Sequence, residues 1–471
     1  MHSLACLEDK LHEECGVIGI YAKESEVVPQ MLCFGLIALQ HRGQESAGIA
    51  VVKDNKMQYY KEMGLVQEVF NTSILNRLHG DVGIGHVRYS TTGESYASNA
   101  QPLVVRYKGG SIALAHNGNL VNANAIRSEL EDDGSIFQTS IDTEVIANLI
   151  AKHYHLGMKQ AIVESVKQIK GSYALVIVME DKLIGVRDPN GIRPLSLAKL
   201  EDGYVLASET CAHDVVGGTF IRDIEPGEMV IIDQNGVESV FFDQSSRKAV
   251  CAFEYVYFAR PDSIIDGRNV FVSRKEAGKI LAQENPVDAD MVIAVPDSGT
   301  AAAIGYAEES GIPFNVGLIK NKYMGRTFIQ PDQKSRELAV RLKLNAMKEN
   351  ISGKRLILID DSIVRGTTSA KLIKMLKDAG ATEVHLRVCS PPVIHSCHFG
   401  IDTPNRQHLI GAVKTLSEIC EAIGADSLAY LSPEGLIKGI GLSRNELCTA
   451  CFDGNYPMEV PENGDKHIFE K

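Results

Sequence analysis

The run LILIDDSIVRGTTS at residues 356–369 limits the possible folds of this chain more than any other stretch. It begins with continuous apolar residues, which are typical of a strand buried on both faces of a sheet. A short loop follows, and then AKLIKMLKDAG, whose apolar spacing predicts a helix. A second apolar run, DMVIAVPDSG at 290–299, is also followed by a small-residue loop and a helical pattern. We therefore predict a parallel α/β sheet in the C-terminal half of the chain.

The loop after the strand at 356 has the composition of an anion site. Gly366 allows an anion to approach the backbone closely, and the N–H groups at the start of the following helix attract negative charge. Asp360 and Asp361, at the end of the strand, are suited to hold ribose hydroxyls or Mg²⁺. The alternative is an acidic strand end followed by an ordinary helix cap. The candidate phosphate-binding residues are Arg365, Gly366, Thr367, Thr368 and Ser369.

Length and charge exclude several classes of protein. A chain of 471 residues is expected to form two or three domains. Its formal net charge of −12 argues against binding to nucleic acid, which needs a basic surface. No apolar run of about 18 residues predicts a membrane span, and the first 14 residues do not resemble a secretory signal. We therefore expect a cytoplasmic protein, whose ten cysteines are metal ligands, nucleophiles or core residues rather than disulfides.

Residues 15 to about 245 are expected to be rich in β-strands, because short apolar runs alternate with Gly, Asp and Asn turn signals. Taken singly, an Asn-Gly pair is usually a hairpin turn, an arginine usually lies on the surface, and a cysteine before an apolar run is usually a core thiol. The segments with residues suited to catalysis are CGVIGI from Cys15, LQHRGQESAGIA (39–50), GHVRYSTTG (85–93), AHNGNLVN (115–122) and SIDTEVI (140–146).

Together and in this order, these segments resemble the glutaminase domain of N-terminal-nucleophile amidotransferases. The resemblance implies that Cys15 attacks the amide of glutamine and that its own α-amino group is the general base. It also implies a four-layer αββα fold. The resemblance further implies that Arg88 binds the carboxylate of glutamine and that Asp142 binds its α-ammonium. It implies that Asn117 and Gly118 form the oxyanion hole and that Thr91 positions the substrate.

A free α-amine at Cys15 requires the removal of residues 1–14, so the resemblance also implies a propeptide. Any other chemistry at Cys15 would require a histidine base. The candidates for that base are His41, His86 and His116.

The stretch at 356–369 resembles the binding signature of type I phosphoribosyltransferases. In that family PDSGT (296–300) is the loop for the pyrophosphate of phosphoribosyl pyrophosphate, so Ser298 becomes a Mg²⁺ ligand, and Gly299 and Thr300 offer backbone donors. The same resemblance makes residues 322–347 a flexible loop that closes over the substrate. The basic candidates in this loop are Lys322, Arg326, Lys334, Arg336, Arg341 and Lys343, each of which could also be a solvated surface charge.

Four cysteines resemble the cluster ligands in one branch of the glutamine phosphoribosyl pyrophosphate amidotransferases. LCTAC (447–451) is a C-x-x-C motif, and CAFEYVYFARPDS (251–263) and HSCHFGIDTP (395–404) resemble the other two ligand segments. Zinc bound by four thiolates, or four unrelated thiols, are the alternatives. Cys389 is expected in the core. The implied ligands of one [4Fe–4S] cluster are Cys251, Cys397, Cys448 and Cys451.

The resemblance spans both halves of the chain and implies one reaction. Glutamine, phosphoribosyl pyrophosphate and water give 5-phosphoribosylamine, glutamate and pyrophosphate, with one Mg²⁺ and one cluster per subunit. The family also implies a homo-oligomer, specifically a tetramer, and inhibition by purine nucleotides. A regulatory protein that binds phosphoribosyl pyrophosphate without amidotransferase activity is the alternative. The expected division is a propeptide at 1–14, a glutaminase domain at 15–248 and a phosphoribosyltransferase domain at 249–471.

Overall fold

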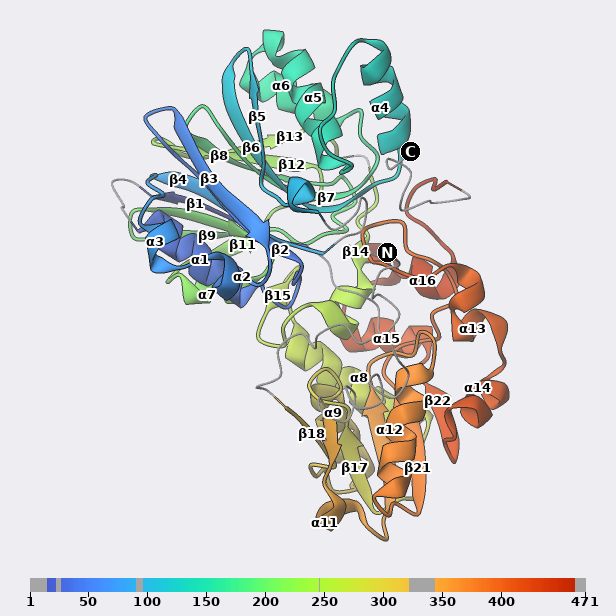
Figure 1. The fold of residues 1–471 in the computed structure, drawn as a ribbon. Helices are drawn as coiled ribbons and strands as arrows, with labels where there is room; N and C mark the ends of the chain where they lie inside the picture. The colour runs from blue at the N-terminus through green and yellow to red at the C-terminus, as the bar shows by residue number, and fades with distance from the viewer. Residues whose placement is uncertain (1–14, 23–26, 90–95, 245, 322–343, 462–471) are drawn as a thin grey trace.

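The computed structural model describes the chain except residues 1–14, 23–26, 90–95, 245, 322–343 and 462–471. Figure 1 shows two bodies, one above the other: the blue-to-green N-terminal half and the yellow-to-red C-terminal half. None of the described helices is long and apolar enough to cross a membrane.

Two antiparallel sheets form the centre of the N-terminal half. The first has the order β11-β9-β10-β1-β4-β2-β3 and consists of β1 Gly16–Ala22, β2 Ser46–Lys53, β3 Lys56–Met63, β4 Val82–Arg88, β9 Ser196–Leu200, β10 Gly203–Ala207 and β11 Thr219–Asp223. The second has the order β13-β12-β8-β7-β6-β5 and consists of β5 Leu103–Tyr107, β6 Gly110–Leu120, β7 Gly171–Met179, β8 Lys182–Arg187, β12 Glu228–Asp233 and β13 Gly236–Phe241.

Helices cover the outer face of each sheet. Against the first sheet lie α1 Val28–Ala38, α2 Val66–Val69, α3 Thr72–Leu75 and α7 Thr210–Val215. Against the second lie α4 Ala123–Asp132, α5 Thr143–His153 and α6 Met158–Val166. Between the sheets, alternate residues such as Val17, Ala113 and Val176 form a separate apolar core. The half is therefore a four-layer αββα structure, which confirms the expected fold. Short 3₁₀ turns are η2 Ala97–Asn99 and η3 Tyr154–Leu156.

A parallel sheet of order β17-β20-β21-β22 forms the centre of the C-terminal half, as predicted. Its strands are β17 Met291–Ala294, β20 Arg355–Asp360, β21 Glu383–Val388 and β22 Ser427–Tyr430. Both faces are buried: Val292 and Ile359 pack toward one set of helices, and Ile293 and Leu358 toward the other. The first set is α8 Val270–Glu284, α9 Thr300–Ser310 and α15 Pro433–Ile440; the second is α12 Thr367–Asp378 and α14 Leu416–Ile423.

The smaller elements of this half are short helices, turns and strand pairs. Residues 322–343, with all six basic loop candidates, lie outside the described residues, but the segments that flank them pair as β18 Leu318–Lys320 and β19 Leu344–Ala346. The other elements are η4 Glu254–Phe258, β15 Ile264–Ile265, β16 Arg268–Asn269, α11 Lys348–Ile351, η5 Arg406–His408, α13 Ile410–Val413, η6 Arg444–Glu446 and α16 Ala450–Asp453.

The end of the chain returns to the start of the C-terminal half. The two-residue strands β14 Val250–Cys251 and β23 Leu447–Cys448 pair in parallel. Residues 398 and 399 contact the N-terminal half. Asn119 Nδ2 donates to the carbonyl of His398 at 2.9 Å, and Ser172 Oγ donates to that of Phe399 at 2.7 Å. The two halves are thus joined by side-chain contacts as well as by the chain. The boundary at 248/249 stays a prediction.

Candidate active sites

Cys15 lies directly before β1, a central strand of the first sheet. The pairing of Gly16 with Val87 places Cys15 beside Arg88, at the end of β4. The thiol is buried, and its Sγ lies 3.5 Å from the carbonyl oxygen of Tyr89, to which it donates. Burial raises the pKa of Cys15 to about 11, against weaker lowering by this bond and by Arg88. At neutral pH the group is therefore a thiol, and it needs a base to become a nucleophile.

The three histidines that could supply this base are engaged elsewhere. His41 Nε2 contacts Glu209 at 2.6 Å, and His86 Nε2 lies 3.0 Å from the carbonyl of His116. Burial lowers the pKa of His86 to about 3, so this ring does not accept a proton at neutral pH. The ring of His116 lies 3.4 Å from Thr143 Oγ1 through Nδ1 and 3.4 Å from the carbonyl of Ser172 through Nε2. None of these contacts, among the described residues, joins a histidine ring to the Cys15 thiol.

Arg88 and Asp142 bring opposite charges to the neighbourhood of the thiol, and both are buried. Arg88 Nη1 lies 3.9 Å from Glu45 Oε2. Asp142 Oδ2 accepts the N–H of Leu120 at 3.0 Å, and its Oδ1 lies 3.5 Å from His116 Nδ1. Burial alone would raise the pKa of Asp142, but His116 and the backbone donors bring it below its ordinary value. A buried cation and a buried anion match the carboxylate and ammonium of a free amino acid.

Asn117 and Gly118 lie on β6, directly after His116, whose ring lies near Asp142. Asn117 is buried, and its Nδ2 has no hydrogen-bond partner among the described residues. An unused buried donor is unfavourable unless a ligand or intermediate accepts from it. Gly118 has φ +148°, and a Cβ there would lie 2.0 Å from the carbonyl oxygen of Ser172. Both features suit an oxyanion hole. Thr91 lies outside the described residues.

We expect Asn117→Ala to reduce the turnover of glutamine by about 10²–10³-fold, because it removes one oxyanion donor. Synthesis from added ammonia should be unchanged, since ammonia does not pass through the acyl intermediate. Asn122→Ala is the matched control, because that side chain donates to the carbonyl of Gln168 at the surface. Steady-state rates with the two nitrogen sources check the prediction, and an equal loss with both would contradict it.

The second site lies at the carboxyl ends of β17 and β20. Asp360 ends β20 and Asp361 follows it, both are buried, and Ser298 lies in the loop between β17 and α9. Ser298 Oγ donates to Asp361 Oδ2, and Ser362 Oγ donates to the other oxygen at 2.8 Å. The structure thus joins residues that lie 63 positions apart in the sequence. Oxygen ligands of this kind at one sheet edge fit a hard cation such as Mg²⁺.

The predicted phosphate loop has the geometry of a helix start. Gly366 is the N-cap of α12 and has φ +81°, a conformation that favours glycine. Thr367 opens the helix, and Ser369 is buried in its first turn. Gly299 is the N-cap of α9, and Thr300 is that helix's first residue. Two helix N-termini therefore lie at the edge where phosphate and pyrophosphate are expected.

Sequence reasoning missed a set of charged side chains buried between the halves. Arg42, beyond the end of α1, contacts Glu209 of the N-terminal half and Glu254 of the C-terminal half. Glu209 also accepts from Ser263 Oγ at 2.6 Å, and Arg193 Nη1 lies 3.6 Å from Glu254 Oε1. These residues are far apart in the sequence, and no local pattern marks a charge as buried. The C-x-x-C and Gly-Thr-Thr motifs, by contrast, are local.

The four candidate cluster cysteines come together, and none forms a disulfide. Burial raises the pKa of Cys448 to about 12, and those of Cys251 and Cys451 also rise, with nearby thiols adding to the effect. Cys397 Sγ accepts the N–H of Phe399 at 3.3 Å. Yet no three His, Cys, Asp or Glu side chains in the described part of the chain surround a point as ligands of one metal ion. Four thiols on neighbouring segments are a donor set that suits either a metal ion or a cluster.

Comparisons with known proteins agree with the fold of both halves. A family model described as a glutamine amidotransferase domain matches residues 86–213. Amidophosphoribosyltransferase of Bacillus subtilis is 52% identical over 455 residues, covering 96% of this chain and 95% of the relative. The enzyme of the same name from Archaeoglobus fulgidus is 52% identical over 453 residues, covering 95% of this chain and 98% of the relative.

Solved structures give the same result. The glutamine phosphoribosylpyrophosphate amidotransferase of B. subtilis, complexed with ADP and GMP, matches with a TM-score of 0.91 at 50% identity, over 97% of this chain and 100% of that one. A structure described as the allosteric regulatory enzyme of purine biosynthesis matches with a TM-score of 0.92 at 51% identity, over 97% and 99% of the two chains.

Fold and sites together define a glutamine amidotransferase whose glutaminase half is joined to a phosphoribosyltransferase-type sheet. At about half identity over nearly the full length, the chain belongs to the amidophosphoribosyltransferase family of purine biosynthesis.

Proposed function

We propose that this chain converts glutamine, phosphoribosyl pyrophosphate and water into 5-phosphoribosylamine, glutamate and pyrophosphate. The Cys15 sulfur attacks the amide carbon, and Asn117 and Gly118 stabilise the oxyanion of the tetrahedral intermediate. The C–N bond of this intermediate then breaks, which releases ammonia and leaves a thioester that water hydrolyses to glutamate. Ammonia attacks C1 of the ribose, and pyrophosphate departs. Because ammonium has no lone pair, an enclosed passage between the sites would keep ammonia in its reactive form.

The observation that carries this proposal is the presence of two complete polar sites in one chain. One has a buried thiol with a cation, an anion and an unused amide donor; the other has two buried carboxylates facing two helix N-termini. A regulatory protein that only binds phosphoribosyl pyrophosphate would not need the first site. The test is pyrophosphate release with glutamine or ammonia as nitrogen source. If neither nitrogen source gave pyrophosphate release, the proposal would be refuted. If only ammonia gave release, the proposed glutaminase activity of the N-terminal half would be refuted.

We propose one Mg²⁺ per subunit, held by Ser298, Asp360 and Asp361. When bound, Mg²⁺ would stabilise the negative charge that develops on pyrophosphate. The contact between Ser298 Oγ and Asp361 Oδ2 supports this assignment, because it brings two oxygen ligands from different loops together. Gly299, Thr300 and the residues of 365–369 would then bind the phosphate groups through backbone and side-chain donors.

We also propose one [4Fe–4S] cluster on Cys251, Cys397, Cys448 and Cys451. The purified protein should contain iron and sulfide and absorb near roughly 400 nm. Cys448→Ser should give unstable or insoluble protein, because binding of the group contributes to folding. Cys420→Ser is the control, since Cys420 lies on α14 and its Sγ donates to the carbonyl of Ala425. Elemental analysis decides the matter: zinc without iron would contradict the cluster.

We propose that the mature chain begins at Cys15. The mechanism needs a free α-amine beside the thiol, whereas an amide nitrogen cannot accept a proton. In one route the Cys15 thiol attacks the carbonyl of Glu14, and water hydrolyses the thioester. Intact-mass analysis of protein purified without oxygen should therefore show that residues 1–14 are missing. Cys15→Ala should stay unprocessed, and Cys6→Ser should not change catalysis. Active enzyme that retains residues 1–14 would contradict the proposal.

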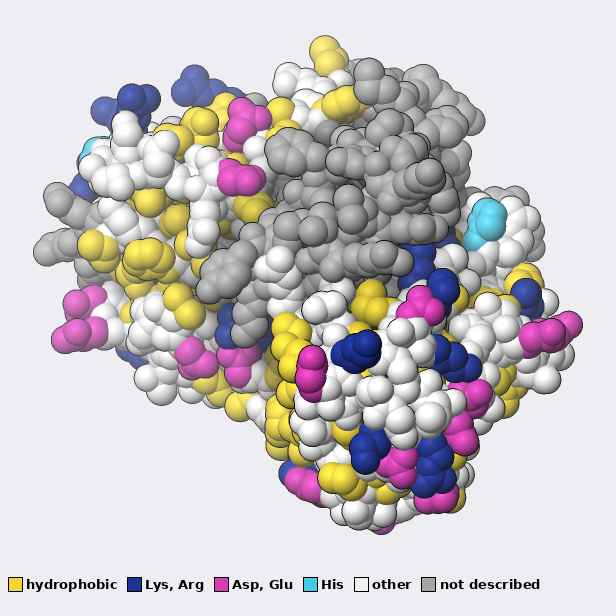
Figure 2. Space-filling view, turned by 60° about the horizontal axis from the view of Figure 1, so that its bottom comes forward, with side chains coloured by type: hydrophobic (Ala, Val, Ile, Leu, Met, Phe, Trp, Pro, Cys, Tyr) yellow, Lys and Arg dark blue, Asp and Glu magenta, His cyan; other side chains and the backbone are white. Residues whose placement is uncertain are grey.

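The proposed setting is a cytoplasmic homo-oligomer, specifically a tetramer, regulated by purine nucleotides. Exposed apolar side chains such as Phe34 of α1 and Val272 of α8 support association between subunits. The nucleotides in the B. subtilis structure support purine inhibitors. Figure 2 shows basic and acidic side chains intermingled over the lower lobe of the view, which supports the absence of a nucleic-acid partner.

A further inference from the structure

Arg274 is a buried cation that the proposed mechanism does not use. It lies on α8, and only 6% of its surface is exposed. Its Nε donates to the carbonyl of Tyr255 at 2.7 Å, and its Nη2 donates to that of Ala259 at 2.8 Å. No carboxylate of the described residues forms an ion pair with it. A buried charge without an ion-pair partner is unfavourable, so the position calls for a compensating interaction.

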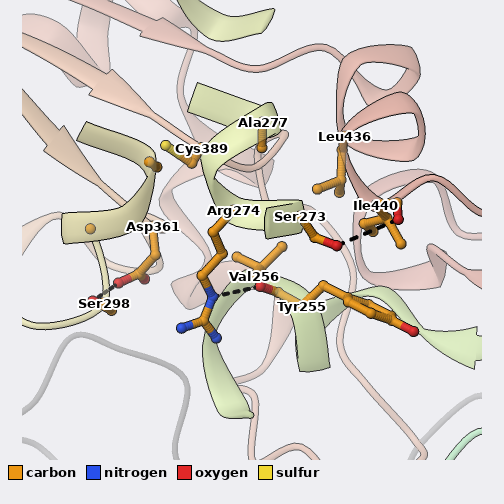
Figure 3. Close-up of a pocket in the computed structure, with 12 residues that line it drawn as sticks. Tyr255, Val256, Ser273, Arg274, Ala277, Ser298, Asp361, Cys389, Leu436 and Ile440 are labelled. Atoms are coloured by element: carbon orange, nitrogen blue, oxygen red, sulfur yellow. Dashed lines mark hydrogen bonds between the residues drawn. The ribbon is translucent and has the colours of Figure 1, made fainter. Parts of the chain in front are cut away.

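A small cavity lies beside this guanidinium. Its volume is about 20 Å³, which is enough for one water molecule. Ser298, Gly299 and Asp361 contribute to its wall together with Arg274. Figure 3 shows the guanidinium between the hydrogen-bonded Ser298–Asp361 pair on one side and Tyr255 on the other. The cation therefore faces the inner side of the proposed Mg²⁺ and pyrophosphate site.

The two carbonyl contacts explain only part of the position. Tyr255 lies in η4, and Ala259 is its C-cap, so Arg274 fixes this short helix against α8. A neutral donor would serve that purpose without the cost of burying a charge. Burial lowers the pKa of Arg274 to about 10, and Asp361 is the strongest of the groups that oppose this shift. The side chain thus stays cationic at neutral pH, and the acidic group that it influences most is Asp361.

We propose that Arg274 is a positioning residue of the phosphoribosyl-transfer site, whose buried charge acts across the cavity on the Ser298–Asp361 pair. It holds the carboxylate and its hydrogen bond from Ser298 in the orientation that binds Mg²⁺–phosphoribosyl pyrophosphate. Arg274 itself touches neither substrate nor metal. The inference rests on the proposed function, because it deepens the role of the same site.

The test uses the ammonia-dependent reaction, which leaves the glutaminase half out of the measurement. Arg274→Met should raise the KM for Mg²⁺–phosphoribosyl pyrophosphate by about tenfold or more, with a smaller change in kcat. Arg274→Lys keeps the charge and should stay within about threefold of the wild type. The control is Lys275→Met, which removes a cation one residue further along α8, where Nζ lies 2.7 Å from Glu308 at the surface. Its KM should not change.

A folded Arg274→Met enzyme with the wild-type KM would overturn the proposal, and so would Arg274→Lys with the KM of the Met variant. If the Met variant does not fold, the Lys variant decides alone: a KM within threefold supports the proposal, and a tenfold rise overturns it. A wild-type enzyme that released no pyrophosphate would contradict the proposed function instead. Calorimetry would then test the role of Arg274 by measuring the Kd of Mg²⁺–phosphoribosyl pyrophosphate for the wild type and the variants. The Kd should rise by about tenfold or more in Arg274→Met and stay within about threefold of the wild type in Arg274→Lys.

Discussion

Replacing Cys15 by alanine is expected to lower glutamine-dependent synthesis by at least about 10⁴-fold, because no other group in the site can form the acyl intermediate. The same variant should keep synthesis from added ammonia at raised pH, where more of the ammonia is unprotonated. Alanine is smaller than cysteine, and the position is already buried, so the fold should tolerate the change. Initial rates with each nitrogen source, measured on one preparation, check the prediction.

Asp360→Asn is the complementary variant, because it changes the phosphoribosyl-transfer site and leaves Cys15 in place. Asp360 ends β20 in the C-terminal half, and its Oδ1 accepts the N–H of Asp361 at 2.9 Å. Neutralising it should impair synthesis from both nitrogen sources, because both depend on transfer to the ribose. The hydrolysis of glutamine at Cys15 should be affected less. Glutamine-dependent synthesis that survives Cys15→Ala would show that the glutaminase site has been misplaced.

The fold was largely predictable because both halves give strong local signals. The apolar run that ends in Asp360 and Asp361 indicates a strand covered on both faces, and the structure places helices on both sides of β20. Residues 141–169 have apolar residues at helical spacing, and the structure forms α5 and α6 there. In each case one periodic stretch contains all the information, so no knowledge of distant contacts is needed.

The site was predictable only where its chemistry lies in a motif. Asn117 and Gly118 are adjacent in the sequence, so a single strand positions both candidate oxyanion donors. Arg274 lies on a helix with no motif, and its importance comes from a carboxylate 87 positions away along the chain. Burial of a charge depends on tertiary packing, which the spacing of residues along one helix does not reveal. The same holds for the ion pairs that join the two halves.

Replacing Arg42 by methionine is expected to lower the free energy of unfolding by about 3–5 kcal/mol, because it removes the cation that lies between two buried carboxylates. The Arg42 side chain is fully buried, and it contacts Glu209 and Glu254 from opposite halves of the chain.

The same variant should also use glutamine less well. The next residue, Gly43, packs so tightly that a Cβ there would lie 2.7 Å from the backbone of Arg88. Displacement of this loop should therefore raise the KM for glutamine. Urea unfolding and glutaminase kinetics measure the two effects.

The control is Lys152→Met, which breaks an exposed ion pair of 2.6 Å with Asp133 and should cost at most about 1 kcal/mol. Arg42→Met combined with Glu254→Gln should lose less than the sum of the two single changes, because the pair is coupled. Additive losses would show that the contact contributes no coupling between the halves.

The pH dependence of this loss identifies its cause. Burial alone would raise the pKa of Glu209, but Arg42 and His41 hold it well below its ordinary value of 4.5. This carboxylate therefore stabilises the folded chain above pH 4.5, and its contribution is lost as the pH falls through the folded pKa. Without Arg42, only His41 and Ser263 oppose the effect of burial on the pKa of Glu209, so its carboxylate stabilises the folded variant less. The difference between wild type and Arg42→Met should accordingly be largest near neutral pH and shrink below pH 4.5. A difference that does not depend on pH would mean that lost packing, not charge, explains the effect.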